Sequence, residues 1–377
     1  MDHERIQPDS PQVDPDGKLA EPNRRSGLTR ARLLRLAALS GGAISAPALL
    51  AACGGGGDDE GSTGAGDFPE TPEWNFVFVN HVTTNPFFVP TQYGISDADA
   101  IFGTKHQWTG SEKSDVSEMV NAFSQAITSK ADGIAVSIID PRAFNEPTER
   151  ALDAGIPVVS YNADAPPESG NKRLAYIGQD LFQSGVRMGE RIVELVDEGL
   201  VPGFIATPGS LNIQPRIDGA KQAVKDSGKD IDFQQIATGP DVAEELARID
   251  AFYRGHKDLK GMFAVDAGST QGVAQTMKKY GLKDKGIAAG GYDLLPTTLQ
   301  LIDEGHLDFT IDQQPYQQGF WPVQQLFLYK LSGGLQAPSD TNTGLLFVTK
   351  ESVRPYLTTK TRFEGSSEEQ KLVEVPS

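Results

Sequence analysis

The chain has 377 residues, of which 38% are hydrophobic and 23% are charged, and it contains a single cysteine. This length suits about two domains, and the apolar fraction excludes wholesale disorder and a protein with many membrane spans. One cysteine excludes an internal disulfide framework and a cysteine-based zinc cluster, and a net charge of −17 argues against binding to nucleic acid or to an anionic membrane surface.

Residues 1–52 have the pattern of an export signal. Arginines cluster between residues 24 and 35, an uncharged apolar stretch follows, and small residues precede Cys53. This order predicts a secretory signal rather than a membrane span, which needs about 20 apolar residues. Residues 50–53 resemble a bacterial lipobox, in which the cysteine is diacylated and becomes the new N-terminus; a free buried cysteine is the alternative. The pair Arg24-Arg25 leaves both Sec and twin-arginine export open.

Residues 53–73 are expected to join the lipidated Cys53 to the folded body. Residues 54–67 are rich in glycine and acidic residues and have almost no apolar side chains, which predicts a flexible tether. The glycine run is not a phosphate-binding loop, because no Lys-Ser/Thr pair follows it. The folded body is expected to begin near Trp74.

From Trp74 onward, short apolar runs alternate with longer amphipathic segments. The runs are often β-branched or aromatic and are bounded by Gly, Pro, Asn or Asp, which predicts buried strands at residues 76–79, 133–139, 156–161, 174–177, 203–206, 261–265, 287–292, 309–311 and 345–348. Apolar residues at helical spacing lie between them, for example Met119, Phe123 and Ile127. Repeated strand–helix units imply parallel sheets that are covered on both faces. A single barrel and two doubly wound lobes both satisfy this pattern.

Polar side chains recur just past the predicted strands. In open α/β sheets ligands bind beyond the carboxyl ends of the strands, and these positions hold Asn85, Asn162, Asp164, Arg216, Asp266, Asp293 and Gln313, interleaved with Phe87, Phe88, Trp108 and Tyr292. Planar polar groups make paired hydrogen bonds to neighbouring hydroxyls, and flat rings cover the apolar face of a sugar. Each residue alone is more often a helix cap, a turn or a core residue, as we interpret Asp140. Their recurrence at equivalent positions predicts a site for a hydroxyl-rich ligand.

A series of short segments, taken in order, resembles the ribose-binding type of the periplasmic sugar-binding proteins of ABC importers. The segments are Asn85-Pro86-Phe87-Phe88, residues 132–134 with 154–159, and residues 216–219, 262–266, 290–293 and 310–316. The resemblance covers residues 76–353 and implies a type I periplasmic-binding-protein fold, an α/β architecture of two doubly wound parallel-sheet lobes joined by a hinge with three crossings. It implies crossings near residues 179–180, 313–314 and 338–342. The N-terminal lobe is then 74–179 plus 314–338, the C-terminal lobe is 180–313 plus 339–355, and 356–377 form a C-terminal tail.

The resemblance also implies the ligand contacts, which fall on Asn85, Phe87, Phe88, Asn162, Arg216, Asp266, Tyr292, Asp293 and Gln313. The chain departs from the ribose-binding pattern in three places, with Asn162-Ala163 for Asp-Arg, Asp266-Ala267 for Asn-Asp and Pro240 for Phe. We therefore expect a ligand other than ribose, with Asp164 and Trp108 as candidates to replace the missing contacts. Several carboxylates beside one assigned arginine favour a neutral or cationic polyhydroxylated ligand over an anionic one.

The function implied by the resemblance is capture of a small carbohydrate or polyol between the lobes by hinge closure, and delivery to the permease and ATPase of an ABC importer. We expect a monomer without cofactor or metal, since the five histidines show no close pairing. The lipid on Cys53 is expected to anchor the exported protein to the outer face of the cell membrane, or in the periplasm.

Three other functions compete with transport. A ligand sensor that presents the closed form to a receptor shares the fold, and the sequence leaves it open. A sugar-active enzyme would use Asp266 and Asp293 as an acid/base pair, but a carboxylate beside Arg216 is expected to stay ionised without a raised pKa. A DNA-binding regulator would need a helix-turn-helix before residue 74 and a basic surface, in place of the export signal and acidic linker.

Overall fold

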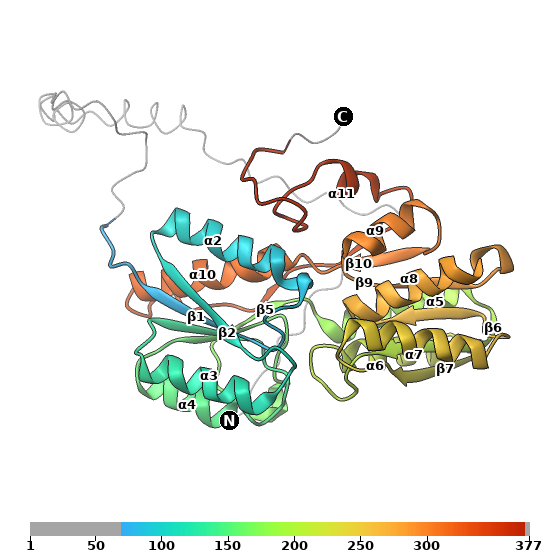
Figure 1. Ribbon diagram of the computed structural model, residues 1–377. Coiled ribbons are helices and arrows are strands. Elements are labelled where there is room, and N and C mark those ends of the chain that lie inside the picture. The colour runs from blue at the N-terminus through green and yellow to red at the C-terminus, as the bar shows by residue number, and fades with distance from the viewer. Residues whose placement is uncertain (1–68, 374–377) are drawn as a thin grey trace, which may run out of the picture. The chain divides into compact units, whose positions relative to one another are not determined.

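The computed structural model describes residues 69–373. The predicted signal peptide (residues 1–52), Cys53 with residues 54–68 of the linker, and residues 374–377 of the tail lie outside the described residues. The described chain forms two six-stranded sheets, each flanked by helices (Figure 1). Two separate sheets confirm the two-lobed α/β architecture and exclude the single barrel.

The first sheet forms the N-terminal lobe. Its strands are β1 (Asn75–Asn80), β2 (Lys105–Gly110), β3 (Gly133–Val136), β4 (Val158–Tyr161), β5 (Tyr176–Gly178) and β11 (Thr341–Asn342), in the spatial order β11-β5-β4-β3-β1-β2 and all parallel. Successive residues of β1 point to opposite faces. Val77 and Val79 pack with α3 (Val116–Thr128) and α4 (Asn145–Asp153), whereas Phe76 and Phe78 pack with α2 (Val89–Phe102) and α10 (Pro315–Leu331).

The second sheet forms the C-terminal lobe. Its strands are β6 (Glu198–Ile205), β7 (Asp230–Ala237), β8 (Gly261–Ala264), β9 (Ala288–Tyr292), β10 (Phe309–Asp312) and β12 (Leu346–Val348), in the order β12-β10-β9-β8-β6-β7. Only β12, which is antiparallel to β10, departs from parallel pairing among these strands. One core lies against α5 (Leu181–Leu195) and α6 (Gln214–Asp226), and the other lies against α7 (Val242–Gly255), α8 (Ala267–Tyr280) and α9 (Pro296–Asp303).

The edge strands β2 and β7 were not among the predicted strands. Both lie at the outer edge of their sheets, where one side of the strand has no neighbouring strand. Exposed residues such as Lys105 and Gln107 alternate with half-buried ones along β2, and β7 shows the same alternation. Their segments are therefore polar and lack the continuous apolar run by which the other strands were predicted.

The chain passes between the sheets three times, after β5, after β10 and after β11. The third passage corrects one predicted domain boundary. The predicted C-terminal lobe includes residues 339–355, but the structure places the first of them in the N-terminal lobe. Strand β11 pairs with β5 of the first sheet, and Asp340 Oδ1 accepts a hydrogen bond from the backbone N–H of Tyr176 at 2.7 Å. Residues 340–342 therefore belong to the first sheet, and the passage to the second sheet follows Asn342.

The residues after β12 connect the second lobe to the first once more. Helix α11 (Arg354–Thr358) packs against α9 (Figure 1). Beyond it, Arg362 forms an ion pair with Asp97 of α2 at 2.9 Å, and the ring of Phe363 meets that of Tyr316 of α10 at 4.8 Å. We call residues 354–367 the C-terminal strap.

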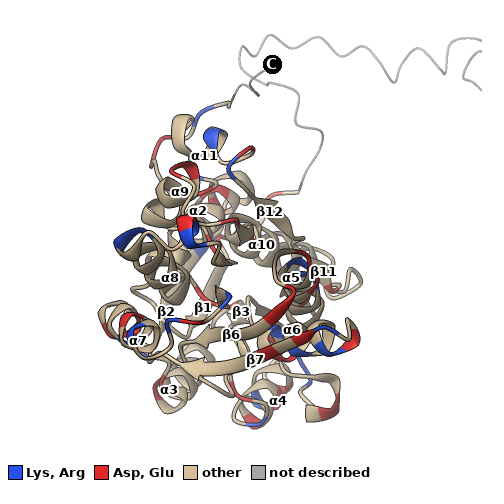
Figure 2. Cartoon of the chain, turned by 90° about the vertical axis from the view of Figure 1, so that its right-hand side faces the viewer, with Lys and Arg blue, Asp and Glu red and all other residues tan. Residues whose placement is uncertain are grey.

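Both signs of charge occur together on outer helices, as on α7 in Figure 2. Several opposite charges are paired at helical spacing, for example Arg187 with Glu190 and Arg248 with Glu244. Such exposed pairs contribute little stability individually. Within residues 69–373, no helix has the length and apolar character that crossing a membrane requires.

Candidate ligand-binding site

A cavity of about 60 Å³ lies at the carboxyl ends of strands from both sheets. It is lined by eight residues that the sequence singled out, Asn85, Phe87, Phe88, Asn162, Arg216, Asp266, Asp293 and Gln313. The remaining lining residues are His81, Val82, Asn212, Ile213 and Ala267. The fold thus brings polar and aromatic side chains from distant parts of the sequence around one small space.

The turn after β1 contributes two aromatic rings. Asn85 caps the 3₁₀ turn Pro86–Phe88, because its Oδ1 accepts a hydrogen bond from the backbone N–H of Phe87 at 3.0 Å. The rings of Phe87 and Phe88 meet edge to face with centroids 4.7 Å apart. Since Phe88 is buried and Phe87 half-buried, the pair forms an apolar wall held by the core on one side.

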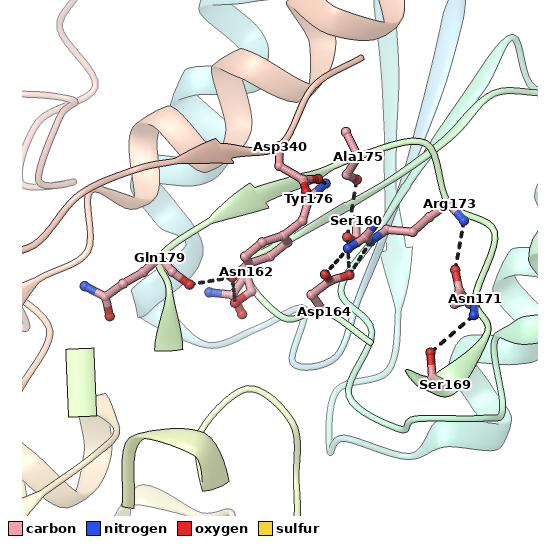
Figure 3. Close-up of polar contacts among 10 residues, drawn as sticks. All are labelled: Ser160, Asn162, Asp164, Ser169, Asn171, Arg173, Ala175, Tyr176, Gln179 and Asp340. Carbon is pink, nitrogen blue, oxygen red and sulfur yellow. Dashed lines mark hydrogen bonds and ion pairs between the residues drawn. The ribbon is translucent and has the colours of Figure 1, made fainter. Parts of the chain in front are cut away.

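Three residues near the strand ends have left-handed backbone conformations, which are uncommon outside glycine. Asn162 (φ 63°) follows β4, Asp293 (φ 76°) follows β9, and Gln314 (φ 58°) lies in the second passage between the sheets. Asn162 is held by two hydrogen bonds. Its Nδ2 donates to Gln318 Oε1 at 3.0 Å. Its backbone oxygen accepts from the hydroxyl of Tyr176 at 3.0 Å, as Figure 3 shows. Strained backbone maintained in this way is typical of functional sites.

Arg216 is the cation of the site. It lies in the first turn of α6 and is only 2% exposed. Its Nη1 donates to the backbone oxygen of Val265 at 2.8 Å, and its guanidinium carbon lies 4.2 Å from the centroid of the Tyr292 ring. Its Nε is buried and has no hydrogen-bond partner within the described chain. A buried arginine with an unsatisfied donor is suited to donating a hydrogen bond to a bound oxygen.

Asp293 faces the cavity as a buried carboxyl group. Gln313 Nε2 donates to its Oδ1 at 2.7 Å. Burial raises the pKa of Asp293 to about 6, although Arg216 acts in the opposite direction. The expectation that an arginine keeps the neighbouring carboxylates at an unraised pKa is therefore wrong for this residue, because the desolvation penalty outweighs the attraction.

His81 and Asn212 join the two lobes beside the cavity. His81 Nε2 lies 3.2 Å from Asn212 Nδ2, and its Nδ1 lies 2.9 Å from Ser137 Oγ. Burial lowers the pKa of His81 to about 3, so the ring is neutral and its Nε2 can accept from the amide of Asn212. Sequence reasoning missed both residues. His81 directly follows β1, so the rule that found the other strand-end residues could have included it.

Trp108, Asp164 and Tyr292 do not line the cavity. The indole N–H of Trp108 donates to the backbone oxygen of Thr83 at 3.1 Å, and its ring packs behind Phe88. Asp164 points to the guanidinium of Arg173, with which it forms an ion pair (Figure 3). Tyr292 is fully buried behind Arg216. The first two are therefore not placed to replace the family contacts that the chain lacks.

The lining groups are suited to recognising hydroxyl groups. Asn85, Asn162 and Gln313 offer amides, Arg216 offers donors, and Asp266 and Asp293 offer acceptors, while the phenylalanines offer flat apolar faces. Within residues 69–373, no three His, Cys, Asp or Glu side chains are grouped so that they could hold a metal ion.

Comparison with known proteins decides the family. The family model described as "Periplasmic binding protein domain" matches residues 76–333. The chain belongs to the periplasmic binding protein family. Membership in this family implies an extracytoplasmic location.

Several sugar-binding and solute-binding proteins are similar to this chain. The xylose/arabinose-binding protein XylF of Sulfolobus acidocaldarius is 52% identical over 314 residues, which cover 80% of this chain and 77% of the relative. A D-ribose/D-allose-binding protein of Pseudomonas aeruginosa is 23% identical over 292 residues, covering 75% of this chain and 90% of the relative. The crystal structure of an ABC transporter solute-binding protein from Burkholderia graminis, in complex with D-arabinose, has 27% identity and a TM-score of 0.69, covering 75% of this chain and 98% of that one.

Proposed function

We propose that this protein captures a small carbohydrate or polyol, foremost an aldopentose, and delivers it to the permease of an ABC importer. The observation that carries the proposal is the cavity lined by amides, carboxyl groups, one arginine and two phenylalanines from both lobes. The sugars named for XylF and for the Burkholderia solute-binding protein support a pentose. These relatives are binding proteins and not enzymes, and the function proposed for this chain likewise includes no catalytic step.

The size of the cavity bears on the mechanism. A cavity of about 60 Å³ is small for a pentose. We therefore expect the lobes to move apart at the three passages between the sheets when a pentose binds. Its hydroxyls would then contact both lobes, and such contacts stabilise the closed form relative to the open one.

The composition of the site favours a neutral sugar. Asp266 and Asp293 face the cavity together with a single arginine, Arg216. An anionic sugar would bring a further negative charge next to two carboxyl groups. A neutral pentose can instead accept from Arg216 and donate to the carboxyl groups.

The proposal includes export and membrane anchoring. The lipobox-like sequence that ends at Cys53 supports lipidation of that cysteine after removal of residues 1–52. A diacylglycerol anchor would hold a monomeric binding protein beside the permease and its ATPase. A sensor that presents its closed form to a receptor is the alternative, and an adjacent permease gene would favour import.

The proposal is tested by calorimetric titration and thermal-shift measurements on the protein without its export signal. D-xylose, L-arabinose, D-arabinose, ribose, hexoses, polyols and a sugar phosphate are compared. We expect at least one pentose to raise the melting temperature through linkage and the phosphate to have no effect. If no carbohydrate or polyol binds, or if the protein hydrolyses a glycoside, the proposed function is wrong.

A further inference from the structure

Glu245 is a buried acidic residue that lies behind the candidate site without lining it. It belongs to α7 and is only 3% exposed. Its carboxyl group occupies the space next to Gly268 in the first turn of α8. A Cβ atom at residue 268 would lie 2.2 Å from Glu245 Oε2 and 2.7 Å from its Oε1. Glycine at this position therefore makes room for the carboxyl group.

The same turn of α8 is held by Asp266, which lines the cavity. Asp266 Oδ1 accepts from the backbone N–H of Ser269 at 2.9 Å, and its Oδ2 accepts from the backbone N–H of Ala206 at 2.9 Å. The carboxyl groups of Glu245 and Asp266 therefore both lie against the first turn of α8, Glu245 beside Gly268 and Asp266 at the backbone N–H of Ser269.

Two ionised carboxylates in contact would repel each other. Glu245 Oε2 is buried and accepts no hydrogen bond within residues 69–373. A protonated carboxyl group, in contrast, is a donor, and the neighbouring Asp266 is an acceptor for it. One proton between the two groups therefore satisfies the unpartnered oxygen and removes the repulsion.

We propose that Glu245 is a positioning residue that carries a proton at neutral pH and donates it to Asp266, which keeps Asp266 oriented toward the sugar. This inference rests on the proposed function, because Asp266 is taken as a sugar contact. Loss of the proton from Glu245 would place two negative charges side by side and displace Asp266. Sugar affinity is therefore expected to fall at alkaline pH.

The surroundings of Glu245 favour the protonated form. Burial, and next the charge of Asp266, raise the pKa of Glu245 to about 9. Asp241, the N-cap of its own helix, acts in the same direction. On the neighbouring elements, Arg216 is bound to the backbone of Val265, and Lys279 of α8 pairs with Asp250 further along α7.

The test compares Glu245→Gln and Glu245→Ala with the unaltered protein by calorimetric titration of a pentose from pH 6 to pH 10. The Gln side chain keeps a donor that cannot ionise, so its affinity should match the unaltered protein at neutral pH and stay constant at alkaline pH. The unaltered protein should lose affinity by up to about tenfold for each pH unit above the pKa of Glu245. Glu245→Ala should bind more weakly at every pH.

Glu244→Gln is the matched control, because Glu244 is the exposed neighbour that pairs with Arg248; it should retain the alkaline loss. An affinity of the unaltered protein that does not change with pH, or a Gln variant as weak as the Ala variant, would overturn the inference. If no pentose binds at all, the proposed function fails. The pH dependence of the melting temperature then still tests Glu245: its folded-state pKa of about 9 lies above the ordinary value of 4.5, so Glu245 lowers the stability as the pH rises between these two values, and this decrease should be smaller in Glu245→Gln.

Discussion

At the scale of single residues, the burial of Asp293 lowers the stability of the fold at neutral pH, whereas we expect it to favour ligand binding. Asp293 is only 4% exposed, so little water solvates its carboxyl group in the ionised form. Burial raises its pKa to about 6. The carboxyl group lines the cavity, where a hydrogen bond from a sugar hydroxyl would replace the water that burial removes.

We expect Asp293→Asn to weaken pentose binding by about 10–100-fold, because a hydrogen bond to a charged acceptor is lost. Asparagine tolerates the left-handed backbone, so the variant should fold. Asp140→Asn is the control, since Asp140 also follows a strand but only caps a turn, accepting from the backbone N–H of Ala143 at 2.7 Å. Calorimetry should show normal binding in the control, and normal binding in Asp293→Asn would remove Asp293 from the site.

The same variant should become relatively more stable as the pH rises. The folded-state pKa of Asp293, about 6, exceeds its ordinary value of 3.8. Between these values the unfolded chain has released its proton and the folded chain has not, so stability falls with rising pH, by up to roughly 3 kcal/mol for one such group. The melting temperature of Asp293→Asn minus that of the unaltered ligand-free protein should therefore increase from pH 4 to pH 7. A constant difference would contradict the raised pKa.

Some residues of the candidate site could be predicted from the sequence alone. Residues that end parallel strands meet at one edge of a sheet, so Asp266 and Asp293, which follow neighbouring strands of the second sheet, could be grouped from the sequence. Asn162 follows a strand of the first sheet, and only the resemblance to a two-lobed family places it opposite them. The same rule does not say which way a side chain turns. Asp164 follows β4 as well, but it turns to Arg173, a partner nine residues later that no strand-end rule considers.

At the scale of elements, helices α5 and α6 approach so closely that glycine is required between them. A Cβ atom at Gly185 would lie 2.2 Å from the backbone oxygen of Arg216, and one at Gly189 would lie 2.7 Å from that of Ala220. The contact with α5 therefore sets the position of the first turn of α6. Arg216 is held in the cavity partly by this helix pair.

We expect Gly185→Ala and Gly189→Ala each to destabilise the fold by about 1–3 kcal/mol through overpacking. Only Gly185→Ala should also weaken pentose binding, because its methyl group presses on the backbone of Arg216. Denaturant unfolding measures the first effect, and calorimetry on the folded variants measures the second. Equal affinities of the two variants would mean that α5 does not position Arg216.

The strands that could be predicted from the sequence are those whose amino-acid composition is determined by burial. The central strands are covered on both faces, so their apolar runs stand out from the surrounding sequence. The two residues of β11, Thr341 and Asn342, carry no such signal. Their place in the first sheet depends on backbone pairing with β5 and on Asp340, which are long-range contacts that no local pattern encodes.

At the scale of the whole molecule, the C-terminal strap adds a contact between the lobes besides the three passages. Its first part packs on the second lobe through α11. Its second part reaches the first lobe, where Arg362 pairs with Asp97 and its guanidinium carbon lies 4.6 Å from the centroid of the Tyr93 ring. Opening of the lobes must therefore move the strap or break these contacts.

We expect Arg362→Met to release the second part of the strap, with a loss of about 2 kcal/mol from the charged hydrogen bond. Hydrogen exchange should then increase in residues 359–367 and less in α11. Arg248→Met is the control, since Arg248 forms an exposed pair within one helix and should leave the strap protected. Unchanged exchange in Arg362→Met would show that Phe363 and its neighbours hold the strap without the ion pair.

The interleaving of the two sheets sets an order for the growing chain. Strands β1 to β5 are synthesised first, but α10, which with α2 covers Phe76 and Phe78, and the edge strand β11 follow the whole run from β6 to β10. The second lobe can thus complete most of its core while the older sheet still exposes an apolar face. We therefore expect chaperones that attend synthesis or export to act mainly on the N-terminal lobe, the part that is started first and finished late.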